Sequence, residues 1–174
     1  FQNDKPDFAP GEGFHYNNSA YFLLGEIVAK VSGKSFGEHL KATIFDPLEM
    51  AHTGIYVNSA APEGMASSYS FVNDKFEPAL DWDMSWAGGA GAIYSTVGDL
   101  YRWNEALFGG RVLSDASLKE ATTPVELPLN VDGMNYGYGL MMLNVKRLPA
   151  VGHGGGLNGW STYLVRLPEQ KCTV

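Results

Sequence analysis

The sequence predicts an α+β fold, with helices first and antiparallel strands last. Two observations lead to this prediction. Apolar residues recur at helical spacing through much of the chain, whereas its last part alternates polar and apolar residues between turns. The 174 residues are enough for one sizeable core. We therefore expect one domain, with its helical part at about 14–130 and its sheet strands at about 134–174.

Each expected helix starts at a capping residue and ends before glycine or proline or at a break in the pattern. Asn18-Ser19 caps the first helix, Ser35-Phe36-Gly37-Glu38 forms a capping box for the second, and Thr96 and Ser114 cap the last two. The four expected helices cover residues of about 20–31, 36–43, 97–108 and 115–122.

β-Forming residues near turn signals indicate strands in two regions. A hairpin is expected where Asn73-Asp74 separates residues 69–71 from residues 75–77. Nearer the carboxyl end, residues 136–143 and 160–167 are expected strands, and the glycine-rich residues 152–159 are expected to form a turn before the second. Residues 87–92 are all glycine or alanine, so we expect another backbone to approach them closely.

Composition and charge argue against several classes of partner. Lysines and arginines are scattered, and a net charge of −7 with a pI near 5.0 disfavours phosphate binding, so we expect no nucleic acid. No apolar run reaches the roughly 18 residues typical of a membrane span. Cys172 is the single cysteine, which leaves the redox compartment open. No His-Glu-x-x-His motif occurs, and we expect neither a metal nor a cofactor.

Two short segments carry side chains that suit hydrolytic chemistry. Tyr16 and Asn18 are two positions apart, so in an extended or turning backbone both project to the same side. A phenol can carry a proton, and a carboxamide can bind a substrate amide or ester. His153 precedes three glycines, and the unshielded N–H of Gly156 could face a developing oxyanion. The structural alternative is a hydrogen-bonded Tyr16, Asn18 as a helix cap, and His153 bonded to a neighbouring carbonyl.

Together these pieces resemble the serine β-lactamase and penicillin-binding-protein superfamily, particularly its class C-like branch of carboxypeptidases, D-aminopeptidases and esterases. That family combines S-x-x-K, a Y-x-N or S-x-N motif, and a K-T-G or H-x-G strand. Tyr16-Asn17-Asn18 matches the second motif and His153-Gly154-Gly155 the third. The supporting stretches are Asn18 to Gly25, Ile44 to Met50 with Thr53-Gly54, and Ala87 to Thr96 with Asp99-Leu100.

The resemblance implies a β-lactamase/DD-peptidase-like fold and acyl transfer through a serine ester. Carried onto this chain, it makes Tyr16 the general base or proton shuttle and gives Asn18 the task of orienting the substrate or the family's lysine. His153 assists electrostatically, and Gly155 and Gly156 belong to the substrate- and oxyanion-binding strand. Small esters, amides or peptides are the implied substrates, and export to the periplasm or beyond is the implied location.

The chain departs from the family pattern in two ways. No serine is followed by lysine three residues later, so the nucleophile is expected before Phe1 and this polypeptide alone is expected to be inactive. Gly154 lacks the hydroxyl that K-T-G offers to a substrate carboxylate, which favours an esterase or peptidase over penicillin hydrolysis. We expect an incomplete domain, cut at both ends, whose sheet is completed by a missing segment or a second chain.

Two other interpretations remain open from the sequence. His153-Gly154-Gly155-Gly156 also spells the HGGG oxyanion loop of some α/β-hydrolases, although no G-x-S-x-G follows it. The chain could instead be a non-catalytic binding or structural module derived from a hydrolase fold. The presence of Tyr16, Asn18 and His153 together argues against a module without chemistry.

Overall fold

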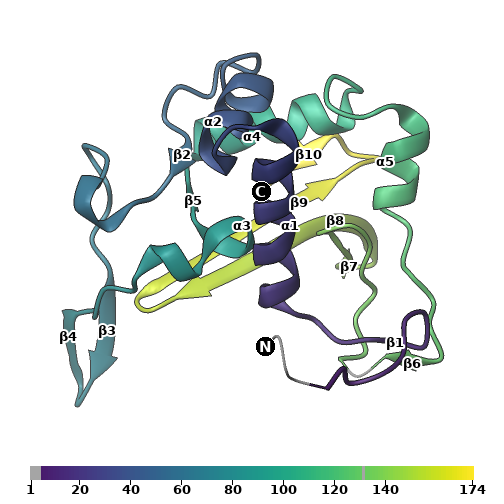
Figure 1. Ribbon diagram of the computed structural model, residues 1–174, viewed down its shortest axis with the longest axis horizontal. Coiled ribbons are helices and arrows are strands. Elements are labelled where there is room, and N and C mark those ends of the chain that lie inside the picture. The colour runs from purple at the N-terminus through teal and green to yellow at the C-terminus, as the bar shows by residue number, and fades with distance from the viewer. Residues whose placement is uncertain (1–4, 131) are drawn as a thin grey trace.

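The computed structural model describes residues 5–130 and 132–174 and confirms a mixed α+β fold (Figure 1). The helices are α1 (Asn18–Ser32), α2 (Phe36–Leu40), α3 (Gly88–Gly91), α4 (Val97–Phe108) and α5 (Asp115–Ala121). Shorter turns are the π-helical η1 (Lys41–Phe45) and the 3₁₀ turns η2 (Asn58–Ala60) and η3 (Met84–Trp86). No helix within the described residues has the length and apolar character needed to cross a bilayer.

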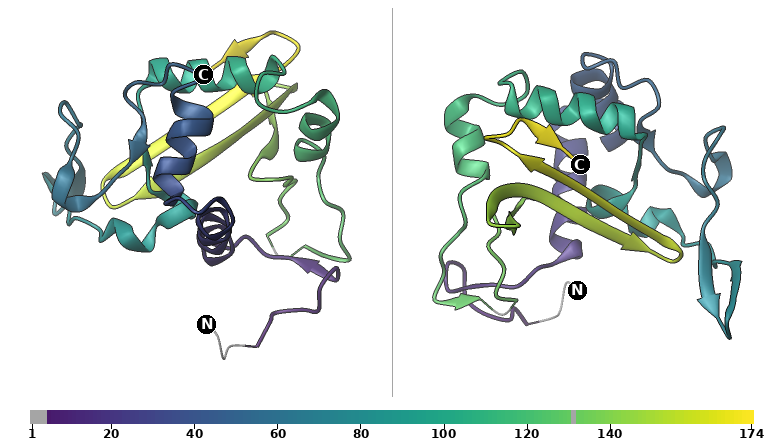
Figure 2. Two further views of the ribbon diagram at one scale, coloured as in Figure 1. Left: turned by 45° about the horizontal axis from the view of Figure 1, so that its top comes forward. Right: turned by 180° about the vertical axis from the view of Figure 1, so that it is seen from behind.

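The main sheet has four antiparallel strands in the order β10-β9-β8-β7, and its long β8–β9 hairpin runs diagonally behind α1 (Figures 1 and 2). These strands are β7 (Met141–Val145), β8 (Leu148–Leu157), β9 (Trp160–Leu167) and β10 (Cys172–Thr173). Three two-stranded pairs surround the sheet. They are β1 (Gly13–Phe14) with β6 (Leu129–Asn130), β2 (Gly54–Ile55) with β5 (Ile93–Tyr94), and β3 (Tyr69–Val72) with β4 (Lys75–Pro78).

The capping residues set the helix boundaries, with one correction. Asn17, not Asn18-Ser19, caps α1, because Asn17 keeps an extended backbone and its Oδ1 accepts the Ala20 N–H at 3.0 Å. The capping box at Ser35 is present, but α2 is shorter than expected and continues as η1. The helices α4 and α5 start after their expected caps, Thr96 and Ser114.

Two predictions about the carboxyl-terminal strands are wrong. Residues 152–157 lie inside β8 rather than in a turn, which is limited to Asn158-Gly159. Glycine is needed here because a Cβ on Gly152 would lie 2.3 Å from the Leu164 carbonyl oxygen of β9. Residues 136–140 form a turn before β7 instead of the start of a strand. After the turn at residues 168–171 the chain returns as β10, which pairs with β9.

The small residues 87–92 do face another backbone. A Cβ on Gly89 of α3 would lie 2.6 Å from the Tyr21 carbonyl oxygen of α1, so these two helices touch through their main chains. The buried apolar residues form two clusters. One contains Phe45, Leu48, Met50 and Ala106, and the other contains Met84, Ala87 and Ala92.

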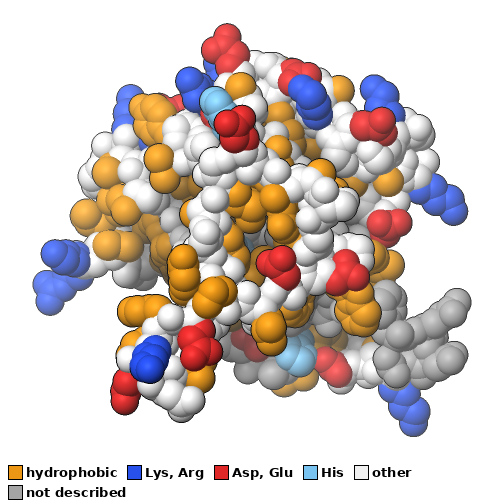
Figure 3. All heavy atoms as spheres, turned by 90° about the vertical axis from the view of Figure 1, so that its left-hand side faces the viewer, with side chains coloured by type: hydrophobic (Ala, Val, Ile, Leu, Met, Phe, Trp, Pro, Cys, Tyr) orange, Lys and Arg blue, Asp and Glu red, His pale blue; other side chains and the backbone are white. Residues whose placement is uncertain are grey.

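Helix α1 also presents an apolar surface that the described residues do not cover. Leu23, Leu24, Ile27 and Val31 are all exposed, Val31 to 83%. Beside α1, a largely apolar hollow of about 610 Å³ lies between α2, α3 and the turns η2 and η3. Figure 3 shows hydrophobic side chains gathered on the side of the molecule that faces left in Figure 1. Large exposed apolar areas of this kind mark contact surfaces.

Buried Asp99 ties α4 to the loop before β2. Its Oδ2 accepts hydrogen bonds from the His52 N–H at 2.8 Å and the Thr53 hydroxyl at 2.9 Å, and its Oδ1 pairs with Arg102 at 3.0 Å. Only 1% of Asp99 is exposed. Its loss leaves these donors without their acceptor in a buried site, which is costly.

We therefore predict that Asp99→Ala lowers the free energy of unfolding by about 3 kcal/mol. Asp46→Ala is the matched control, because Asp46 pairs with Lys41 at the surface and its loss should cost far less. Urea denaturation of both variants measures the difference. Equal losses would contradict the structural role given to Asp99.

Candidate active site

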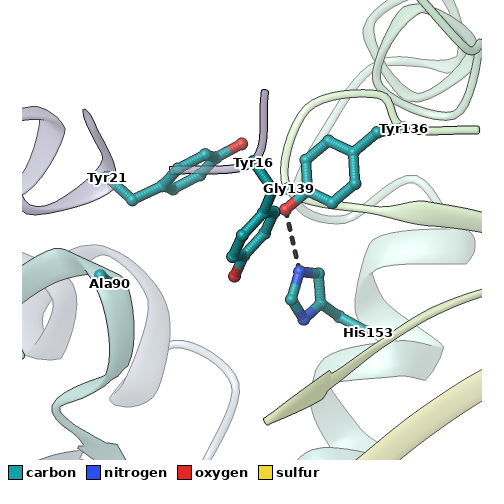
Figure 4. Close-up of a pocket in the computed structure, with 6 residues that line it drawn as sticks. All are labelled: Tyr16, Tyr21, Ala90, Tyr136, Gly139 and His153. Atoms are coloured by element: carbon teal, nitrogen blue, oxygen red, sulfur yellow. Dashed lines mark hydrogen bonds between the residues drawn. The ribbon is translucent and has the colours of Figure 1, made fainter. Parts of the chain in front are cut away.

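Side chains from four parts of the chain line one small pocket of about 190 Å³ (Figure 4). Tyr16 lies just before α1, Tyr21 comes from α1, Ala90 from α3, and His153 from β8. The other two lining residues, Tyr136 and Gly139, lie in the turn before β7. The pocket therefore forms where the first helix meets the last sheet.

The structure brings together Tyr16 and His153, the two residues expected to share a site. Their ring centroids are 5.8 Å apart. Tyr16 lies between β1 and α1, where its backbone N–H donates to Asp132 Oδ2 at 2.5 Å. Asn18 is exposed in the first turn of α1 and is not among the pocket-lining residues. Because Asn17 supplies the cap, the Asn18 amide is not needed for it.

Tyr136 is the central residue of the pocket, and the sequence analysis missed it. Its hydroxyl lies 2.9 Å from His153 Nε2, and its ring packs edge-on against Tyr16 with centroids 5.6 Å apart. Only 5% of Tyr136 is exposed. A signal was present in Tyr136-Gly137-Tyr138-Gly139, where alternating glycines favour a turn over the strand that was predicted.

The pocket disfavours ionisation of the Tyr16 and Tyr136 phenols. Burial raises the pKa of Tyr16, and the nearby Tyr21 adds to this shift. Burial likewise raises the pKa of Tyr136, and the neighbouring Tyr21 and Tyr16 phenols raise it further. None of the six lining residues is lysine or arginine. A phenolate in this pocket would therefore need a positive charge brought from elsewhere.

The pocket adjoins an open edge of β8. Strand β7 pairs with β8 only from Leu148 to Gly152. Gly152 of β8 lies opposite Val165 of β9. Because the N–H and C=O of Val165 both bond to Val174, they point away from β8, and Gly152 forms no backbone hydrogen bond with Val165. In an antiparallel pair, successive residues point their N–H and C=O groups alternately toward and away from the partner strand. The N–H and C=O of Gly155 therefore point toward β9, and those of Gly156 point toward the open edge.

Comparisons with known proteins identify the family of the chain. A family model described as Beta-lactamase matches residues 1–174. The chain belongs to the beta-lactamase family. Penicillin-binding protein 4* of Bacillus subtilis (strain 168) is 30% identical over 180 residues, covering 96% of this chain and 40% of that protein. D-aminopeptidase of Gluconobacter oxydans (strain 621H) is 28% identical over 170 residues, covering 96% of this chain and 31% of that protein.

Among solved structures, a D-stereospecific amidohydrolase from Streptomyces sp. aligns with a TM-score of 0.84 and 31% identity. The alignment covers 98% of this chain and 51% of that one. These comparisons confirm the family and the β-lactamase/DD-peptidase-like fold expected from the motifs. The chain spans between 31% and 51% of the length of the beta-lactamase-family relatives described above.

Metal chemistry finds no support in the side-chain arrangement. Over residues 5–130 and 132–174, no three His, Cys, Asp or Glu side chains are grouped so that they could hold an ion. The candidate groups for chemistry in this beta-lactamase-family chain are thus the phenols, the imidazole and the backbone of β8.

We predict that the pKa of the Tyr16 phenol lies above 10, the ordinary tyrosine value, because burial disfavours the phenolate. NMR of ¹³C-labelled tyrosine rings across an alkaline titration measures this, with Tyr16→Phe to assign the signal. A titration midpoint for Tyr16 at or below pH 10 would contradict the burial argument.

Proposed function

We propose that this chain is part of a serine hydrolase that cleaves esters or amides through an acyl-enzyme. The observation that carries the proposal is that Tyr16 and His153, with ring centroids 5.8 Å apart, lie together beside the open edge of β8. A proton-carrying group, an imidazole and exposed backbone donors are the parts that acyl transfer needs around a nucleophile.

The nucleophile is proposed to come from a Ser-x-x-Lys segment outside the given sequence. Two observations support an added segment: the apolar surface of α1 is exposed, and the relatives are at least about twice as long. The lysine of that segment would also supply the positive charge that the pocket lacks, and so stabilise a Tyr16 phenolate. In this proposal one incomplete beta-lactamase-like domain is completed by that segment.

In the proposed reaction the serine oxygen attacks the substrate carbonyl while its proton passes to Tyr16. The carbonyl oxygen becomes an oxyanion, and the Gly156 N–H at the open edge is one donor to it. Gly155, bonded to β9, holds this edge in place, and Asn18 orients the substrate or the lysine. Tyr16 then returns the proton to the leaving amine or alcohol, and water releases the acyl group by the same steps.

The open edge also favours extended substrates. The Gly154 N–H and the N–H and C=O groups of Gly156 can pair with a peptide laid beside β8 as an added strand. Names of relatives agree with amide substrates, since they include a D-aminopeptidase and a D-stereospecific amidohydrolase. We propose small amides, esters or peptides as the substrates of the complete protein.

The two alternatives fare differently. His153 to Gly156 lie inside a strand of an antiparallel sheet, not in a loop between a strand and a helix, so the HGGG loop of an α/β-hydrolase does not apply. A non-catalytic module remains the second candidate, because the phenols of the pocket are held neutral in the described chain.

We predict that a longer protein with the Ser-x-x-Lys segment is acylated by p-nitrophenyl esters and that Tyr16→Phe slows it about 10²–10⁴-fold, the usual contribution of general acid–base catalysis. Tyr101→Phe, on the exposed face of α4, is the matched control. Mass spectrometry detects the acyl adduct, and release of p-nitrophenol measures the acylation rate.

The 174-residue chain alone should show no turnover in the same assay. Turnover by this chain that a serine-directed phosphonate inhibits would contradict the missing nucleophile. Absence of any adduct on the longer protein would instead favour the non-catalytic module.

A further inference from the structure

Both ring nitrogens of His153 are hydrogen-bonded inside the protein. Figure 4 shows the bond to Tyr136. Nδ1 lies 2.6 Å from the Gly154 carbonyl oxygen, and Nε2 lies 2.9 Å from the Tyr136 hydroxyl. A carbonyl oxygen only accepts hydrogen bonds, so Nδ1 must carry the hydrogen. In the neutral ring Nε2 is then the acceptor, and the Tyr136 phenol is its donor.

We propose that Tyr136 is a positioning residue, which selects the Nδ1–H tautomer of His153 and through it fixes the Gly154 carbonyl at the open edge of β8. The proposed function gives this role its catalytic meaning, but the tautomer itself does not depend on that function. In solution the neutral histidine side chain favours the Nε2–H tautomer. The protein must therefore supply the preference for Nδ1–H.

Tyr136 is built to hold one position. Its ring packs on Phe14, with centroids 5.4 Å apart, and meets the His153 ring edge-on at 5.7 Å. Its carbonyl accepts the Val125 N–H at 3.0 Å. The next residue, Gly137, cannot carry a side chain, because a Cβ there would lie 2.1 Å from the Ala121 carbonyl oxygen. The phenol is therefore anchored from both the ring and the backbone.

The consequence concerns how His153 acts. With Nδ1 bonded to Gly154 and Nε2 bonded to Tyr136, the neutral ring has no nitrogen left to bind a substrate. Its contribution is then to hold the Gly154 carbonyl in place at the open edge of β8. Gly154 precedes Gly156, whose N–H also faces that edge. Tyr136 acts on that edge through His153, not by touching the substrate.

The test is ¹⁵N NMR of histidine-labelled protein at a pH of about 8.5, above the ordinary imidazole pKa. His153→Gln assigns the signals of the ring. We expect a protonated Nδ1 and an unprotonated Nε2 in the wild type. Tyr136→Phe removes the donor to Nε2, and the His153 signals should shift toward the Nε2–H form.

Tyr138→Phe is the matched control, since this exposed phenol lies in the same turn but bonds Glu120 at 3.0 Å. It should leave the His153 signals unchanged. If Tyr136→Phe does not fold, 3-fluorotyrosine labelling replaces it, because a more acidic phenol should shift the Nε2 signal while the fold is kept.

A wild-type His153 in the Nε2–H form would overturn the proposal, as would identical spectra for the wild type and Tyr136→Phe. In a catalytically active longer protein, Tyr136→Phe should lower kcat and leave KM unchanged. An inactive longer protein with the Nδ1–H tautomer would contradict the proposed function but not the role of Tyr136.

Discussion

The difference in length between β7 and β8 shapes the candidate active site. Strand β8 has ten residues and β7 has five, and their pairing ends at Gly152. Beyond that point the described residues pair with β8 on the β9 side only, and its other edge opens beside the pocket. Unpaired backbone at a sheet edge invites another strand, and a binding site is one use of that tendency.

A second constraint joins the two segments that carry the pocket phenols. The parallel pair of β1 and β6 places Phe14 beside Asn130, and the Tyr16 N–H bonds to Asp132 just beyond it. The chain that leads to Tyr16 is thereby fastened to the chain that leads to Tyr136. Residues far apart in sequence converge on His153 because these short pairings hold them there.

The local patterns predicted the helices well because caps and helical spacing are properties of neighbouring residues. The candidate site residues Tyr16 and His153, which the structure places beside each other, also came from the sequence, through two short motifs and their order. What failed depended on distant contacts. The glycines of β8 were interpreted as a turn, because only the structure shows that Leu164 of β9 crowds Gly152. The role of Tyr136 was missed because it depends on a partner in another strand.

Amide hydrogen exchange of β8 tests most directly that its edge is open. The structure predicts slow exchange at His153 and Gly155, whose N–H groups bond to β9, and fast exchange at Gly154 and Gly156, which face the open edge. Equal protection of Gly155 and Gly156 would contradict the account, because the proposed oxyanion donor would then already be paired.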